Sequence, residues 1–137
     1  MFKKIMVPVD LEHTGQLEKS ITAATGLAKQ YGSELCFVGV GTSAPSAVSH
    51  NAAEYKEKLA AFAAEQAVEH GVEAGCQAFF SHDLPAEVDD DLLKAVKETG
   101  ADLVVMASHV PTIINYVWPT NGGKIANYAK TSVFLVR

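Results

Sequence analysis

The sequence is almost without arginine, since Arg137, the last residue, is the only one. Proteins that bind nucleic acid usually cluster arginine, because its planar guanidinium can contact two phosphate oxygens at once. The net charge of −5 also disfavours a nucleic-acid partner. The sequence therefore argues against nucleic-acid binding, and any contact with a phosphate must come from backbone amides and lysine.

Long hydrophobic runs and metal-type cysteine spacing are missing as well. The apolar run at residues 5–9 is interrupted by Asp10 and is far too short for a signal sequence or a membrane span. Cys36 and Cys76 lie in predicted strands without the spacing of a metal site, which favours two buried, reduced thiols over a disulfide or ligand role. We therefore expect a cytoplasmic protein that does not contact membranes.

The composition, with 48% hydrophobic and 20% charged residues, is typical of one globular α/β domain spanning residues 1–137. Apolar runs predict five buried strands, at 4–9, 35–40, 72–80, 102–107 and 132–137. Apolar residues at helical spacing predict helices at 14–31, from the N-cap Asn51 to His70, from about Pro85 to Gly100, and from Thr120 onward.

Five strands alternating with four helical patterns predict a doubly wound parallel sheet. Right-handed crossovers allow the strand order 3-2-1-4-5 with helices on both faces. The strand order then reverses at a switch point between the first and fourth strands, and ligands of open α/β sheets bind in the crevice at that point. The residues that end these two strands are Pro8, Val9, Asp10, Ala107, Ser108 and His109.

Three stretches resemble the universal stress protein (UspA) superfamily: FKKIMVPVD at the start, ADLVVMASH in the fourth strand and TNGGKIANYAKTSVFLVR at the end. The similarity spans the whole chain, and the Ala-Ser-His-x-Pro string resembles the UspF/UspG-like branch. The resemblance implies a Rossmann-like fold of the adenine nucleotide alpha hydrolase type. It also implies a non-enzymatic stress-response regulator with a crevice for ATP or another adenine nucleotide, together with Mg²⁺.

The phosphate loop departs from the family pattern. ATP-binding members carry Gly-x-x-Gly, nine residues and then Gly-[Ser/Thr], because glycine lets backbone amides approach phosphate oxygens. Here Ala107 and Val110 replace the first two glycines, Pro119 stands before the expected third, and the spacing is one residue short. Valine crowds the cradle and proline has no amide to donate. We therefore expect weak or lost ATP affinity.

The adenosine half of the implied site is better retained. By resemblance, Asp10 matches the carboxylate that contacts ribose and a divalent metal, and Val40 matches the residue that contacts adenine. Thr120, Asn121 and Gly122 open a helix with unpaired amides, which suits either an anion or an ordinary helix cap. The candidate nucleotide-binding residues are Pro8, Val9, Asp10, Val40, Ala107, Ser108, His109, Thr120, Asn121 and Gly122.

Other chemistries are weaker. Asp10 is the candidate metal ligand, and a wider metal set would consist of Asp10, Glu12, His13 and His109. His109 could equally bond a backbone carbonyl at the strand end. A hydrolase triad with Ser108 is disfavoured, because an adjacent Ser and His cannot readily pair as nucleophile and base. The acidic run 89–91 points to different helix faces and suits a solvated helix N-terminus.

Two segments favour protein contacts. Residues 110–119 form an apolar run that either packs as a turn of helix over the sheet edge or is exposed as a partner surface or lid. The last strand, 132–137, is apolar on both faces and invites pairing with a second copy across a twofold axis. The family resemblance also implies a homodimer through this strand.

Three functions are compatible with these observations. The first is a nucleotide-binding regulator, and the second is a dimeric interaction module that acts through residues 110–119 without a nucleotide. A slow nucleotide hydrolase ranks third, because no base is placed to activate water and the only arginine is terminal.

Overall fold

The computed structural model describes residues 1–42, 44–46, 48–81, 84–107 and 130–137, and side chains at 84–89 are left out. The elements follow the order β1 (Lys4–Val9), a 3-10 turn η1 (Thr14–Leu17), α1 (Glu18–Tyr31), β2 (Glu34–Gly41), α2 (Ala52–His70), β3 (Ala74–Phe80), α3 (Leu84–Thr99), β4 (Leu103–Ala107) and β5 (Ser132–Val136).

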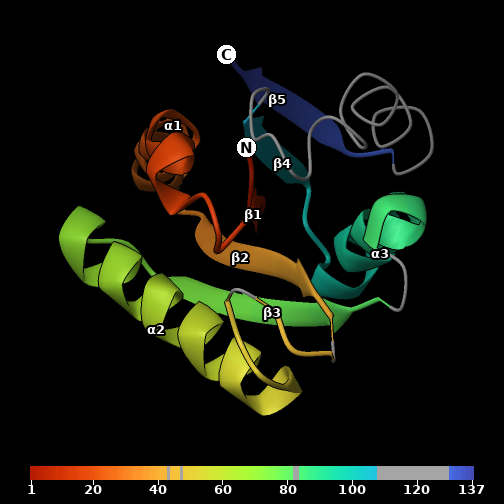
Figure 1. The fold of residues 1–137 in the computed structure, drawn as a ribbon. Helices are drawn as coiled ribbons and strands as arrows, with labels where there is room; N and C mark the ends of the chain where they lie inside the picture. Colours follow the sequence, from red (N-terminus) through yellow and green to blue (C-terminus); the bar gives the residue numbers. More distant parts are fainter. Residues whose placement is uncertain (43, 47, 82–83, 108–129) are drawn as a thin grey trace.

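The five strands form one parallel sheet in the order β3-β2-β1-β4-β5, which confirms the predicted topology. Helices α1 and α2 lie over one face of the sheet and α3 over the other (Figure 1). No helix among the described residues is long and apolar enough to cross a bilayer.

The central strand β1 is buried on both faces because β2 and β4 flank it and helices cover it from both sides. Ile5, Val7 and Val9 alternate into the core beneath α1 and α2, whereas Met6 packs in the core beneath α3. This alternation follows from the two-residue period of a strand. It brings Asp10 to the middle of the carboxyl edge of the sheet, where β1 ends between its neighbours.

The helix signals predicted from sequence are confirmed with small differences. The Asn51 side chain accepts a hydrogen bond from the Glu54 amide at 2.9 Å, as expected of an N-cap. The predicted helix at 14–31 begins instead with the 3-10 turn, and α3 ends at Thr99, just before Gly100, which has a φ of 68°. Pro85 lies in the first turn of α3, where proline is tolerated.

Two expectations need correction. Cys36 is buried as predicted, but Cys76 is exposed on β3, an edge strand of the sheet. Burial still raises the pKa of both cysteines, so both are protonated thiols at neutral pH. The acidic run 89–91, expected at a solvated helix N-terminus, lies in the second turn of α3 instead of at its start, and Asp90 is exposed there.

Candidate functional site

The predicted crevice lies at the carboxyl ends of β1, β2 and β4, and the structure describes half of its candidate residues. The described ones are Pro8, Val9, Asp10, Val40 and Ala107. They gather at one edge because three neighbouring parallel strands end there. The remaining candidates, Ser108, His109, Thr120, Asn121 and Gly122, lie outside the described residues, as do the segment 110–119 and the helix expected from Thr120.

Among the described candidate residues of this edge, Asp10 is the buried carboxylate. Its residue is only 8% exposed. Its Oδ1 accepts a hydrogen bond from the Glu12 amide at 2.9 Å, and its Oδ2 lies 2.9 Å from His13 Nδ1. The Asp10 carbonyl oxygen also accepts a bond from the His13 amide at 3.1 Å. Residues 10–13 thus form a tight turn that is closed by hydrogen bonds to Asp10, a residue type that favours such turns. The turn fixes the Asp10 carboxylate at the switch point between β1 and β4.

Tyr55 of α2 lies near this edge, and no sequence motif marked it as part of the site. Its ring covers the carboxyl end of β2, where a Cβ at Gly39 would overlap the tyrosine hydroxyl and one at Gly41 would meet the ring at 3.0 Å. The two glycines two residues apart in β2 were the available signal for such a close approach. Burial, followed by the carboxylates of Asp10 and Glu12, raises the pKa of Tyr55. A neutral phenol therefore lies near Asp10.

Three of the four predicted metal ligands lie close together. The ligand atoms of Asp10, Glu12 and His13 lie within 4.8 Å of one another. Two carboxylates and an imidazole are donors that a divalent cation accepts. His109, the fourth expected member, falls outside the described residues. The three described donors therefore fit part of a cation site, with Asp10 as its buried member.

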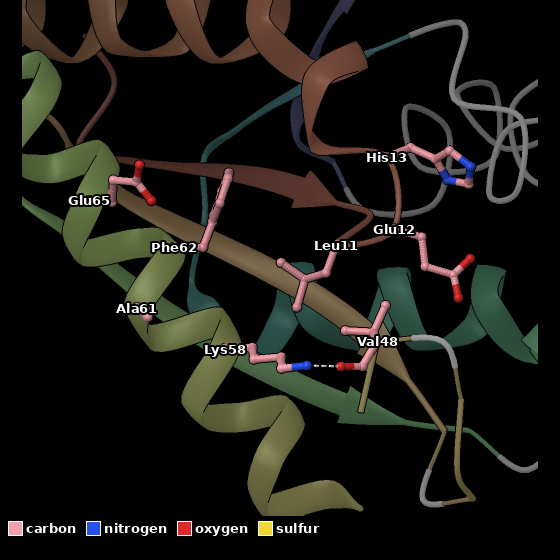
Figure 2. A pocket seen from close by; sticks show the side chains of 8 residues that line it. All are labelled: Leu11, Glu12, His13, Val48, Lys58, Ala61, Phe62 and Glu65. Atoms are coloured by element: carbon pink, nitrogen blue, oxygen red, sulfur yellow. Dashed lines mark hydrogen bonds between the residues drawn. The ribbon is translucent and has the colours of Figure 1, made fainter. Parts of the chain in front are cut away.

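A pocket of about 680 Å³ opens beside this loop rather than at the crevice itself (Figure 2). Its walls come from the loop after β1, from Val48 and from one side of α2. It includes Glu12 and His13 but neither Asp10 nor Val40. It is therefore a neighbour of the predicted nucleotide crevice and not the crevice itself.

Comparison with known proteins finds matches in the universal stress protein family. The model of the universal stress protein family matches residues 1–137. A universal stress protein from Archaeoglobus fulgidus superposes with a TM-score of 0.68 at 18% identity, over 100% of both chains. One from the same organism, in complex with dAMP, gives 0.68 at 19% identity over 98% of each chain. An Arabidopsis thaliana family protein with AMP bound gives 0.65 at 14% identity, over 98% of this chain and 90% of that one. At these identities the likeness shows the fold.

Proposed function

Because the chain belongs to the universal stress protein family, we propose that it is a stress-response regulator that binds an adenine nucleotide in the crevice at the carboxyl ends of β1, β2 and β4. Binding rather than catalysis is the proposed activity, with occupancy changing the affinity for a partner. Membership of the UspF/UspG-like branch remains a prediction.

The observation that carries the proposal is the buried carboxylate of Asp10. Burying an ionised carboxylate is costly unless hydrogen bonds or a cation compensate. This one is held at the switch point, and the partner of its Oδ2 is a half-exposed side chain. Such an oxygen can accept a hydrogen bond from a ribose hydroxyl. Val40, 9% exposed at the end of β2, is the adjacent apolar surface proposed to meet the base.

We propose further that nucleoside monophosphates bind more tightly than ATP. Two of the similar structures hold AMP and dAMP, which carry one phosphate each. In this chain Val110 and Pro119 replace amide-presenting positions of the phosphate loop. If a divalent ion accompanies the nucleotide, Asp10, Glu12 and His13 would hold it and neutralise phosphate charge.

Calorimetric titration with AMP, dAMP and ATP, with and without Mg²⁺, tests the proposal, and GMP is the control. At a hundred times its dissociation constant, a ligand adds about 2.7 kcal/mol to the unfolding free energy, so AMP should raise the melting temperature by several degrees. Exchanging both Val110 and Pro119 for glycine should raise ATP affinity. If no adenine nucleotide binds at millimolar concentration, the function is the interaction module instead.

A second proposal, a homodimer through Ser132–Val136, is supported by the exposed side chains of β5. Phe134 and Leu135 are 44% and 38% exposed on an edge strand of the sheet. Pairing two such strands would satisfy their outer amides and cover these side chains. Light scattering should give twice the chain mass. Exchanging Phe134 and Leu135 for Glu should give a folded monomer, whereas Glu at Gly75 and Cys76 on the other edge should not.

A further inference from the structure

A groove runs between α1 and α2 on the face of the sheet opposite α3. The pocket of about 680 Å³ beside the β1 loop forms its head. A second hollow of about 330 Å³ continues along the two helices, with Glu18 on the α1 side and Glu69 on the α2 side. Phe62 and Glu65 line both hollows, so the two are parts of one depression. The groove adjoins the proposed nucleotide crevice and, among the described residues, shares with it only Glu12 and His13, the candidate cation ligands beside Asp10.

The walls of this groove are strongly acidic. Its four carboxylates are Glu12, Glu18, Glu65 and Glu69. Lys58 is the one lysine among its described lining residues, and its amine is already engaged, at 3.3 Å from Glu54 and in a bond to the Val48 carbonyl oxygen (Figure 2). Within the described part of the chain, the ion pairs join other residues and leave these four carboxylates without a cation.

The placement of Glu65 and Glu69 is unfavourable for the isolated helix. They stand four residues apart on α2, the spacing at which like charges repel. Glu69 also lies in the last turn of α2, where the helix dipole disfavours a negative charge. Elsewhere the same spacing carries opposite charges, as in Glu54–Lys58 and Lys94–Glu98. A cation supplied from outside would relieve both repulsions.

The floor of the groove is apolar, and its side chains pack against the core. Phe62 is half-buried, and its ring meets Phe37 edge-to-face with centroids 5.4 Å apart. Leu11 and Val48 are also partly buried and line the head of the groove (Figure 2). A ligand that carried only positive charge would leave these side chains in water. The chemistry therefore fits a chain that bears both cationic and apolar side chains.

We propose that the groove between α1 and α2 binds a basic amphipathic segment of a partner protein. Lysine or arginine side chains of that segment pair with the four glutamates, and its apolar side chains cover Phe62 and Leu11. The α2 wall from Lys58 to Glu69 is about 17 Å long, which matches roughly three turns of a partner helix. A second copy of this chain is a poorer occupant, because each copy has a net charge of −5.

The first test uses fluorescence anisotropy at about 0.15 M salt. The probe is a labelled synthetic helix of roughly four turns, with lysine on one face and leucine on the other. We expect saturable binding that weakens about tenfold when serine replaces leucine, and that is lost when glutamate replaces lysine. Equal binding of the serine peptide, or equal displacement by spermidine, would show a nonspecific attraction for polycations and overturn the proposal.

The second test compares two variants with the same charge change. Glu65→Lys places a cation in the groove, whereas Glu57→Lys places it on the exposed outer side of α2. Glu65→Lys should weaken peptide binding about tenfold, and Glu57→Lys by less than about twofold. Glu65→Lys should not lower the melting temperature, because it removes the repulsion with Glu69. AMP binding should survive in both, which separates this proposal from the nucleotide site. Equal losses of peptide affinity in the two variants would refute it.

Discussion

Asp10 and Asp102 are two aspartates at opposite ends of the central strands, and they are held in different ways. Asp102 precedes β4 at the amino edge of the sheet, and its carboxylate accepts from backbone amides: from Lys3 at 2.9 and 3.2 Å and from Lys4 at 3.1 Å. Asp10 follows β1 at the carboxyl edge, and it has one backbone amide and one histidine side chain as partners.

This difference in partners indicates that the Asp102 carboxylate is structural, whereas the Asp10 carboxylate can bind a ligand. The amides around Asp102 belong to the chain itself, and they join the start of β1 to the start of β4 without any side chain that could be exchanged. Asp10 is buried, yet its Oδ2 is held by a side chain rather than by the backbone. A ligand can replace or share such a partner without breaking the fold.

The largest expected effect is the loss of nucleotide binding in Asp10→Ala. A hydrogen bond to a charged group is worth about 1.5–3 kcal/mol, so affinity for AMP should fall roughly a hundredfold. The unfolding free energy should change by about 1 kcal/mol or less, because only local turn bonds are lost. Calorimetry and urea denaturation measure the two quantities. A variant that fails to fold would make Asp10 a structural residue like Asp102.

Asp102→Ala should show the opposite pattern. It leaves the Lys3 and Lys4 amides without their acceptor and should lower the unfolding free energy by about 1–3 kcal/mol. The melting temperature should fall by roughly 4–10 °C. AMP affinity should stay at the wild-type value, because the nucleotide crevice lies at the other edge of the sheet. Unchanged stability would show that the three hydrogen bonds contribute little.

The pH dependence of Asp102 should be visible in the same measurement. Burial alone would raise the pKa of Asp102, but the hydrogen bonds from Lys3 and Lys4 outweigh it and hold the pKa below its ordinary value. Its stabilisation is therefore present above the unfolded-state pKa of about 3.9 and is lost as the pH falls through the folded value. The stability gap between wild type and Asp102→Asn should be constant from about pH 5 to 8 and narrow below about pH 4. A gap that persists at low pH would contradict this.

The fold could be predicted because each strand is an apolar run and right-handed crossovers leave few topologies. The predicted and observed strand ends agree within two residues. The largest difference is at β3, which was predicted to begin at residue 72 and begins at Ala74. The exposure of Cys76 was missed because an apolar run looks the same in a covered central strand and in a partly uncovered edge strand. Such exposure depends on what covers that part of the sheet face.

The candidate site was predictable only where the family resemblance or a strand end marked it, as at Asp10. Its bond to His13 and the contact of Tyr55 with Gly39 depend on side-chain direction and on two elements meeting in space. The acidic groove joins Glu18 of α1 to Glu69 of α2, which no periodic pattern relates. Contacts of this kind arise from packing, so local sequence signals do not contain them.

The smallest expected effect concerns His13, whose ring nitrogen lies 2.9 Å from the exchangeable oxygen of Asp10. If a nucleotide hydroxyl takes over that oxygen, binding must offset the loss of the histidine contact. His13→Ala removes this competition, so AMP affinity should rise about two- to fivefold, the equivalent of one modest hydrogen bond. Glu12→Ala is the matched control, because Glu12 contacts Asp10 through its backbone amide, which the substitution keeps. Titrations in EDTA remove divalent ions from the comparison. A tenfold loss of affinity in His13→Ala would instead make His13 part of the nucleotide site and would mean that both Asp10 oxygens are fixed, as those of Asp102 are.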